Sequence, residues 1–259
     1  MPANSLYVLT GASRGLGAAL AEALSRRGWR LVVDGRTPDR LAATVAALPR
    51  PDLVTAVPGD VADPDHRATL AGAVGDRLDL LVNNASELGP TPLPRLADLP
   101  PTALERVLAV NTVAPLALVQ AVLPALERAR GVVLDVSSDA AVEAYEGWGG
   151  YGASKAALDR LSAVLAVEHP GLRVYAVDPG DMATDMHRAA DPGATGLPEP
   201  AAVVPALLRL VDEDLPGGRY RVAFPQDPAA SLRAVGGGEV LLLPSGRYRA
   251  ADLTAEAVR

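Results

Sequence analysis

The sequence predicts an α/β protein built on a doubly wound parallel sheet in three layers. Short apolar runs alternate along the chain with longer segments of helical periodicity, and the apolar runs are almost continuously hydrophobic. Strands of this kind are buried on both faces, which is typical of a parallel sheet covered by helices on each side. Because crossovers between parallel strands are right-handed, successive units wind onto both sides of the sheet and give a Rossmann-like architecture.

The first part of the chain accounts for four strands and three helices. The expected strands cover residues 5–10, 30–35, 52–60 and 78–85. The helices expected between them cover residues 16–28, 37–48 and 63–75. Thr37 suits the cap of the second helix, and Pro38 suits its first position, where a missing N–H group removes no helix hydrogen bond.

The second part continues the alternation. A long helix is expected over residues 102–129, bent before Pro115 or frayed near Pro124, because proline removes a helix hydrogen bond. The elements expected after it are a strand at 131–138, a helix at 150–169, a strand at 172–180 and a helix at 201–211. The runs 218–224 and 238–244 are both candidate strands, either of which could complete the sheet.

Composition limits the class of protein. The 259 residues suit one domain over 1–259, since no low-complexity linker divides them. The formal net charge is −7, which argues against binding to nucleic acid or to an anionic lipid surface. The chain contains no cysteine, which excludes disulfides and thiolate catalysis, and its three histidines show no metal-binding spacing. We therefore expect neither a nucleic-acid partner nor a metal site.

The location expected from the sequence is the cytoplasm. The first 13 residues lack the basic region and the long apolar stretch of a signal peptide. Pro, Asp, Glu or Arg interrupts each apolar run before it reaches about 18 residues, the length that a membrane-spanning helix needs. A soluble protein without a membrane partner is expected from both observations.

A glycine-rich turn follows the first expected strand. It has the sequence TGASRGLG and contains Gly11, Gly15 and Gly17. Glycine permits the positive φ angles of a tight turn and lets the backbone approach a pyrophosphate closely. The turn opens a helix, whose free N–H groups attract phosphate. Its place at the first strand–helix junction favours a phosphate-binding turn over an ordinary glycine-rich turn.

Six further motifs follow this turn. They are GDV at 59–61, NNAS at 83–86, VNT at 110–112, DVSS at 135–138, YGASK at 151–155 and DPGDMAT at 178–184. Taken together and in this order, they resemble the motifs of the short-chain dehydrogenase/reductase family, and the resemblance covers residues 5–190. Ser86 stands where the family's Asn-Asn-Ala-Gly turn has glycine. Each motif is a modest signal alone, whereas their joint order is very specific.

The resemblance implies a nicotinamide dinucleotide cofactor. The glycine turn would hold its pyrophosphate, GDV its adenine ring, and the DPGDMAT segment would lie near its nicotinamide. The residues that the resemblance assigns to the cofactor are Gly11, Ser13, Arg14, Gly15, Leu16, Gly17, Arg36, Asp60, Val61, Asn83, Ala85, Tyr151, Lys155, Pro179, Gly180, Met182 and Thr184.

The choice between NAD(H) and NADP(H) depends on the end of the second strand. A carboxylate there selects NAD through the ribose 2′-hydroxyl, and a basic group pairs with the 2′-phosphate of NADP. By analogy with the family, the acid position falls on Gly35, with Arg36 directly after it and Arg14 as a second candidate cation. Asp34 would repel a phosphate, unless it faces the sheet interior or a neighbouring turn. The sequence favours NADP(H).

Tyr151 and Lys155 are the candidate proton-transfer pair. They are four residues apart on an expected helix and so share a face, and Lys155 is the only lysine in the chain. The ordinary pKa of tyrosine is about 10, and a nearby cation lowers it, so that the phenol could exchange a proton with a carbonyl or alcohol oxygen. The resemblance also implies that Lys155 holds the nicotinamide ribose.

Ser138 and Asn111 complete the candidate catalytic set. Ser138 is expected at the carboxyl end of a strand, where its hydroxyl can hydrogen-bond the substrate oxygen, and Ser137 is the neighbouring alternative. The resemblance implies that Asn111 anchors a water that relays protons to Lys155. No Ser/His/Asp triad is evident nearby, so nucleophilic hydrolysis is not expected.

The expected function is that of an NADP(H)-dependent oxidoreductase. It would transfer a hydride between nicotinamide and the carbonyl or secondary alcohol of a small organic substrate, with Tyr151 as general acid/base. The alternative is a non-catalytic, NADP(H)-binding regulatory or redox-sensing protein on the same fold. Residues 139–150 are expected to line one wall of the substrate pocket, and residues 181–200 to form a lid over it.

The C-terminal stretch departs from the family's pattern. Members often end in a Thr-Gly strand followed by Asp-Gly-Gly, whereas residues 213–259 form an atypical extension in which GRYR occurs at 218–221 and again at 246–249. Family members commonly assemble through their two long helices and their last strand. The resemblance therefore implies a homodimer or a homotetramer. The altered extension counts against the tetramer more than against the dimer.

Overall fold

The computed structural model describes residues 5–222, 234–235 and 239–242. The strands in this part of the chain are β1 (Leu6–Leu9), β2 (Arg30–Gly35), β3 (Val54–Pro58), β4 (Leu80–Asn83), β5 (Val132–Val136), β6 (Arg173–Asp178), β7 (Gly218–Val222), β8 (Ala234–Val235) and β9 (Glu239–Leu242). The α-helices are α1 (Gly15–Arg26), α2 (Pro38–Ala46), α3 (Pro64–Gly72), α4 (Pro101–Leu108), α5 (Ala114–Ala129), α6 (Gly149–Glu168), α7 (Asp185–Ala190) and α8 (Pro200–Asp212).

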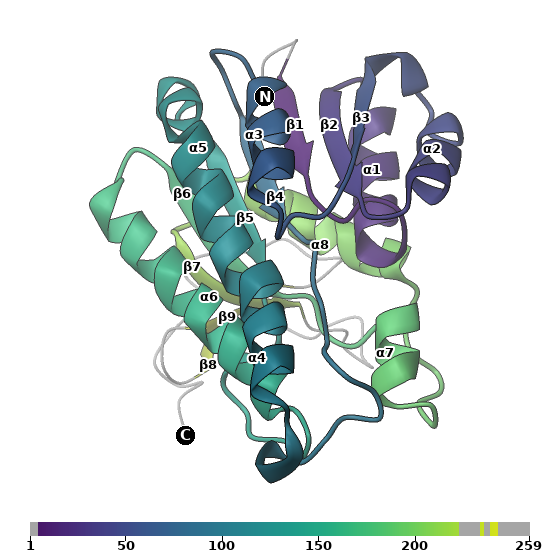
Figure 1. The fold of residues 1–259 in the computed structure, drawn as a ribbon. Coiled ribbons are helices and arrows are strands. Elements are labelled where there is room, and N and C mark those ends of the chain that lie inside the picture. The colour runs from purple at the N-terminus through teal and green to yellow at the C-terminus, as the bar shows by residue number, and fades with distance from the viewer. Residues whose placement is uncertain (1–4, 223–233, 236–238, 243–259) are drawn as a thin grey trace.

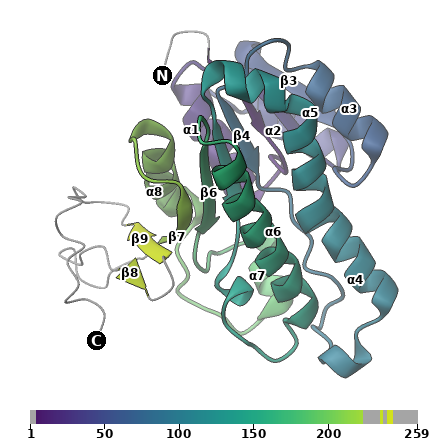
Figure 2. The same ribbon diagram turned by 90° about the vertical axis from the view of Figure 1, so that its left-hand side faces the viewer.

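These strands form one sheet between two layers of helices (Figures 1 and 2). The strand order over the described residues is β3-β2-β1-β4-β5-β6-β7-β9-β8. Neighbours from β3 to β9 are parallel, and β8 pairs with β9 in the antiparallel sense. The predicted doubly wound parallel fold is therefore confirmed, and both candidate C-terminal strands belong to the sheet. The second GRYR, at 246–249, lies outside the described residues.

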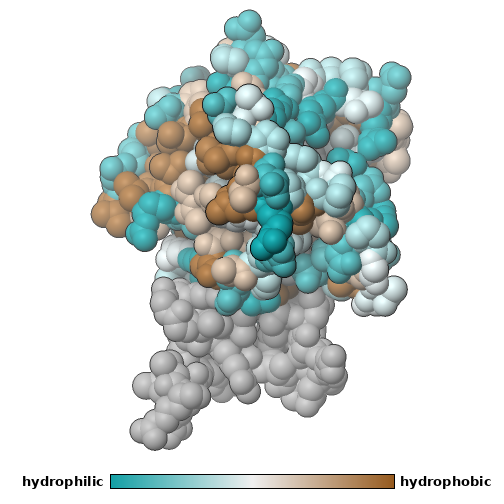
Figure 3. All heavy atoms as spheres, turned by 60° about the horizontal axis from the view of Figure 1, so that its bottom comes forward, coloured by the Kyte–Doolittle hydropathy of each residue, from teal (hydrophilic) through white to brown (hydrophobic). Residues whose placement is uncertain are grey.

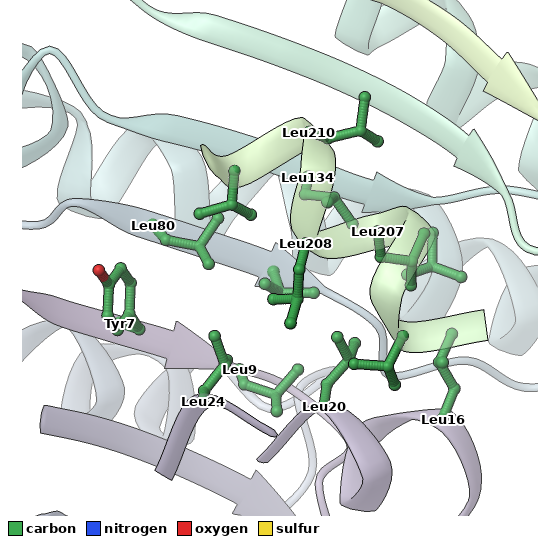
Figure 4. Close-up of a cluster of buried hydrophobic side chains, with 14 of the residues drawn as sticks. Tyr7, Leu9, Leu16, Leu20, Leu24, Leu80, Leu134, Leu207, Leu208 and Leu210 are labelled. Atoms are coloured by element: carbon green, nitrogen blue, oxygen red, sulfur yellow. The ribbon is translucent and has the colours of Figure 1, made fainter. Parts of the chain in front are cut away.

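The two faces of the sheet are covered by different helices. Side chains of α1 and α8 pack with β1, β4 and β5 on one face, and side chains of α3 and α5 pack on the other. Figure 4 shows the first of these clusters, in which leucines of both helices meet side chains of the strands. Each fully buried leucine stabilises the fold by about 1.5–3 kcal/mol relative to an exposed one. Leucine, valine and alanine therefore fill a core in a chain that has few aromatic residues.

The helix predicted at 102–129 is interrupted by one wide turn. Residues 109–113 form a π-helical turn between α4 and α5, and Pro115 lies in the first turn of α5. Proline has no N–H group to donate to the preceding turn, which explains why the regular helix is broken just before this position. Wide turns of this kind often occur at functional sites. This one contains Asn111, whose side chain is fully buried.

Taken together, residues 101–129 are long and apolar enough to cross a membrane by length and composition alone. Half of the most apolar window is buried inside the protein, however. Leu118, Val122 and Leu126 belong to the core on one face of the sheet. We interpret the segment as a core helix, because one of its faces packs against the sheet.

Candidate active site

A pocket opens at the carboxyl edge of the sheet, where the loops after β1, β2, β4, β5 and β6 converge. The strand order reverses between β1 and β4, and ligands of open α/β sheets bind at such a reversal. The predicted residues that line the pocket are Gly11, Ser13, Arg14, Gly15, Leu16, Gly17, Arg36, Asp60, Val61, Ala85, Ser138, Tyr151, Lys155, Pro179, Gly180, Met182 and Thr184. Asn83 and Asn111 are not part of this lining.

The glycine turn has the shape that its sequence requires. Gly11 has a φ angle of 70°, a conformation that side chains rarely adopt. A Cβ atom at Gly17 would overlap the carbonyl oxygen of Gly11. The side chain of Arg14 does not cap α1, so the first N–H groups of that helix are left for a ligand. The turn and the helix N-terminus together suit a pyrophosphate.

Asp34 serves this turn. Its side chain is 1% exposed, and its Oδ1 accepts a hydrogen bond from the Gly11 N–H at 2.5 Å. Its Oδ2 lies 3.1 Å from His66 Nε2. Burial raises the pKa of Asp34, and the hydrogen bonds from His66 and Gly11 oppose that rise. Both carboxylate oxygens of Asp34 therefore bind protein groups. Because the side chain faces the neighbouring turn, it does not oppose the binding of a phosphate.

The part of the pocket beside the glycine turn and the end of β2 is basic. Arg14, Arg36 and Arg40 all line it. Arg36 Nη1 lies 3.1 Å from Glu87 Oε2, and Arg14 Nη1 lies 3.2 Å from Asp185 Oδ2. The side chains of Arg36 and Arg14 are about half exposed, and exposed ion pairs of this kind contribute at most about 1 kcal/mol. A phosphate could therefore displace either carboxylate at small cost.

The two asparagines of NNAS point in different directions. Asn83 is buried in β4, where its Nδ2 donates to Asp135 Oδ1 at 2.7 Å. Asn84 lines the pocket, and its Nδ2 donates to the carbonyl oxygens of Thr10, at 2.8 Å, and Gly11, at 3.2 Å. Asn84 thus ties the glycine turn to the end of β4, a task that sequence reasoning had not given it. Because neighbouring residues of an extended segment point to opposite sides, the sequence could have predicted that only one of the two asparagines lines the pocket.

Tyr151 lies near the start of α6 and is almost fully buried. Its ring packs edge-to-face against Trp148, with 5.7 Å between the ring centroids. Burial is the largest of the effects that raise the pKa of Tyr151 to about 12; the charges of Asp178 and Asp139 also raise it, and hydrogen bonds with Ser86 and Ser138 lower it. Without a bound cofactor the pKa of Tyr151 is therefore raised, mainly by burial, whereas a lowered pKa was expected from the nearby cation.

Lys155 is held firmly beside that ring. It is 1% exposed, and its Nζ donates to the carbonyl oxygen of Val136 at 2.7 Å. Nζ lies 5.6 Å from the centroid of the Tyr151 ring. Burial lowers the pKa of Lys155 to about 8, and the charges of Asp159 and Asp135 oppose that change. A buried lysine of lowered pKa in a pocket is a mark of a functional site.

Ser138 follows β5 and lies in the pocket beside Tyr151. Its Oγ donates to Asp139 Oδ1 at 3.1 Å and accepts from the Ala140 N–H at 3.2 Å. Ser137, the alternative, also lines the pocket and is 2% exposed. Of the two serines that end β5, Ser138 is the one whose hydrogen bonding lowers the pKa of Tyr151, which favours Ser138 over Ser137 as the residue that contacts a substrate oxygen.

Asn111 ties the loop after β4 to α6. Its Oδ1 accepts hydrogen bonds from the Glu87 N–H, at 2.8 Å, and from Ser86 Oγ, at 3.2 Å. Its Nδ2 donates to Glu87 O at 2.8 Å and to Ser154 Oγ at 2.9 Å. The amide group is thus occupied by protein partners, so the water-anchoring role implied by the resemblance would fall to its backbone.

Sequence reasoning missed an arginine that supports the site from β7. Arg219 Nη2 donates to the carbonyl oxygen of Ser138 at 2.8 Å, and Arg219 Nε donates to Asp159 Oδ2 at 2.8 Å. Asp159 lies one helical turn after Lys155. Arg221, on the same face of the strand, lies 3.3 Å from Asp178. The first GRYR thus places Arg219 against the backbone of Ser138 and Arg221 against the side chain of Asp178.

Apolar side chains also contribute to the pocket lining. Leu88, Trp148, Met182 and Met186 line it together with His187. The helix α7 lies within the predicted lid, and Thr184 caps it by accepting a hydrogen bond from the His187 N–H at 3.1 Å. Among the residues that the structure describes, His, Asp and Glu form no group of three that could hold a metal ion.

The family model described as short chain dehydrogenase matches residues 6–194. Sepiapterin reductase of Bos taurus is 35% identical over 205 residues, which cover 72% of this chain and 76% of the relative. The rhamnolipids biosynthesis 3-oxoacyl-[acyl-carrier-protein] reductase of Pseudomonas aeruginosa is 33% identical over 205 residues, which cover 74% of this chain and 79% of the relative. The structure of an alcohol dehydrogenase from the archaeon Thermococcus sibiricus, complexed with 5-hydroxy-NADP, has a TM-score of 0.77 at 26% identity and covers 87% of this chain and 100% of that one.

Proposed function

Because the chain belongs to the short-chain dehydrogenase family, we propose that it is an NADP(H)-dependent oxidoreductase that acts on the carbonyl or secondary alcohol of a small organic substrate. The observation that carries the proposal is the position of Tyr151. Tyr151 lines the same pocket as Ser138, Ser86 and the glycine turn, and hydrogen bonding with the two serines lowers the pKa of its phenol against the effect of burial. An acid, a donor for a substrate oxygen and a pyrophosphate cradle therefore share one cavity.

The protein's own residues supply the proton and hold the substrate oxygen, and a bound nicotinamide would supply or accept the hydride. In carbonyl reduction, Tyr151 donates its Oη proton to the substrate oxygen while Ser138 donates a hydrogen bond to the same atom. The raised pKa of Tyr151, about 12, keeps the phenol protonated at neutral pH. Reduction needs the protonated phenol and alcohol oxidation needs the phenolate, so neutral pH favours reduction and alkaline pH favours oxidation.

The cofactor would lie along the carboxyl edge of the sheet. The glycine turn suits the pyrophosphate, Asp60 and Val61 would contact the adenine ring, and Lys155 would hold the ribose nearest the nicotinamide. Pro179 and the residues up to Thr184 would enclose the nicotinamide itself. All of these side chains or backbone groups line the same pocket, which supports the arrangement.

Preference for NADP(H) rests on the end of β2. Gly35 occupies the position where an acid would select NAD, and Arg36, Arg14 and Arg40 line the adjacent part of the pocket. The carboxylate of Asp34 is engaged by Gly11 and His66 and so does not face a 2′-phosphate. The related alcohol dehydrogenase was solved with 5-hydroxy-NADP, which is in keeping with this preference.

Replacing Arg36 by alanine should weaken NADPH binding and leave NADH binding unchanged, because only NADPH carries the 2′-phosphate. We expect the Kd for NADPH to rise about 10- to 100-fold, the size of one or two charge-assisted hydrogen bonds. Titration calorimetry with both cofactors measures the difference. Arg26→Ala, which removes an exposed arginine of α1 outside the pocket, is the matched control. An equal loss for NADPH and NADH in Arg36→Ala would contradict the assignment.

Besides a small-molecule substrate, we propose that the protein binds further copies of itself. Val113 and Leu116 of the helical stretch through α5, and Val164 and Val167 of α6, are exposed. Figure 3 shows hydrophobic atoms gathered on the side of the molecule where α4, α5 and α6 lie. A homodimer through α5 and α6 would cover them, and a homotetramer would need the sheet edge as well. We propose a cytoplasmic location, without nucleic-acid or membrane partners.

A screen of carbonyl compounds with NADPH tests the proposed function. We expect the purified protein to consume NADPH with at least one aldehyde or ketone, at a rate proportional to enzyme concentration. The alternative, a regulatory protein that only binds NADP(H), predicts tight NADPH binding by calorimetry and no consumption with any compound in a broad panel. That second result would reject catalysis while leaving the cofactor assignment in place.

A further inference from the structure

Ser86 places a hydroxyl in the active-site pocket that the proposed function does not use. It follows β4 and lines the pocket with Ser138 and Tyr151. Leu88, two residues further on, packs in one buried cluster with the Tyr151 ring and Ala140. This packing holds the loop that carries Ser86 against the start of α6, and hydrogen bonding with Ser86 is one of the effects that lower the pKa of the Tyr151 phenol.

The direction of the hydrogen bond between Ser86 and Asn111 is fixed by the neighbours of Asn111. Both N–H donors of Asn111 Nδ2 are engaged, by Glu87 O and by Ser154 Oγ. The other end of the amide is therefore the oxygen, and it also accepts the Glu87 N–H at 2.8 Å. Because an amide oxygen only accepts, Ser86 must be the donor across the 3.2 Å separation. The lone pairs of Ser86 Oγ are then left to accept a hydrogen bond from Tyr151.

We propose that Ser86 is a catalytic residue whose hydroxyl turns from Asn111 to Tyr151 when the phenol loses its proton. With a neutral phenol and no substrate, Ser86 donates to Asn111 Oδ1 and its oxygen can accept the single O–H of Tyr151; when a carbonyl substrate binds, that O–H turns to the substrate oxygen. Once Tyr151 has given its proton to the substrate oxygen, Ser86 donates to the phenolate, and Asn111 Oδ1 keeps the N–H of Glu87. The O–H bond of Ser86 stays intact, so the phenol proton of Tyr151 is the only proton transferred.

This inference rests on the proposed function and deepens it. A hydrogen bond to an ionised oxygen is about twice as strong as one between neutral groups. Ser86 should therefore stabilise the phenolate more than the phenol and hold the pKa of Tyr151 below the value that burial alone would give. Alcohol oxidation, which needs the phenolate as base, should depend on Ser86 more strongly than carbonyl reduction does.

The test compares Ser86→Ala and Ser86→Gly with the wild type and with Ser86→Thr, which keeps a hydroxyl. For alcohol oxidation, the rising limb of log kcat/KM against pH should move up by about one pH unit in the Ala and Gly variants. At any one pH on that limb, their kcat/KM should be about tenfold lower than that of the wild type, and Ser86→Thr should recover most of the loss. Reduction at neutral pH should fall by a smaller factor.

A second readout follows Tyr151 directly. In protein labelled with ¹³C at the tyrosine ζ carbon, the resonance of Tyr151 is the one that is lost in Tyr151→Phe. Its titration should move to higher pH in Ser86→Ala and Ser86→Gly, and thermal unfolding should show that both variants are folded. An unchanged limb and an unchanged titration in both variants would overturn the role of Ser86. If Tyr151→Phe kept wild-type turnover, the proposed function itself would fail instead.

Discussion

Tyr151→Phe should lower kcat/KM for carbonyl reduction by about 10²- to 10⁴-fold, because it removes the phenol proton that Tyr151 donates to the substrate oxygen. The ring itself should stay in place, since it packs against Trp148 and Leu88 rather than through its hydroxyl. NADPH binding and the thermal unfolding midpoint should therefore remain close to those of the wild type. Steady-state kinetics and titration calorimetry measure the two parts of this prediction.

Tyr145→Phe is the matched control for that variant. It removes the same hydroxyl six residues earlier, where Tyr145 is 46% exposed and outside the pocket lining. Its hydroxyl donates to Asp139 Oδ2 at 3.0 Å, so its loss should change kcat/KM by no more than a few fold. Equal losses of activity in the two variants would show that the Tyr151 hydroxyl has no special role.

Lys155→Met should also lower kcat/KM by about 10²- to 10⁴-fold, and it should weaken NADPH binding. Methionine keeps the length of the side chain but removes both the charge beside Tyr151 and the donor that would hold the ribose. The carbonyl oxygen of Val136 loses its partner at 2.7 Å, a cost of about 1 kcal/mol. Turnover by Lys155→Met within a few fold of the wild type would contradict the assignment.

The pH dependence of the free energy of unfolding tests the burial of the Lys155 charge separately from its role in turnover. Burial lowers the pKa of this lysine from 10.5 to about 8, so its charged form is less stable in the folded protein than in water. Between pH 8 and 10.5 the unfolded chain binds more protons than the folded one, and the stability contributed by this group rises with pH. In Lys155→Met this rise should be absent. Below pH 8 the variant should be more stable than the wild type, because it lacks the desolvation cost of the buried charge, and this advantage should disappear by pH 10.5, where the unpartnered carbonyl oxygen of Val136 remains as the cost. Denaturant unfolding over this pH range provides the measurement.

Much of the fold was predictable because strand and helix signals are local. The apolar run at 172–180 and the periodic run at 150–169 each contain their own pattern, and they match β6 and α6 closely. The π-helical turn at 109–113 was predictable only as a bend before Pro115. The membership of β7 and β9 in the sheet depends on pairing between distant segments, which left two alternatives at the level of sequence.

The site was predictable in its membership more than in its contacts. Ordered motifs placed most candidate residues at strand ends, and those residues line one pocket. The contact of Arg219 with Ser138 joins residues 81 positions apart, and the engagement of Asp34 by Gly11 joins residues 23 apart. The pKa of Tyr151 was expected in the wrong direction, because burial cannot be read from the spacing of YGASK.

The most direct test of the proposed mechanism is deuterium transfer to a carbonyl substrate from NADPH that carries deuterium at both C4 positions. We expect the wild type to form product with deuterium at the carbinol carbon, and we expect Tyr151→Phe to form far less of this product at the same enzyme concentration and time. Product without deuterium, or labelled product formed as fast by Tyr151→Phe as by the wild type, would contradict it.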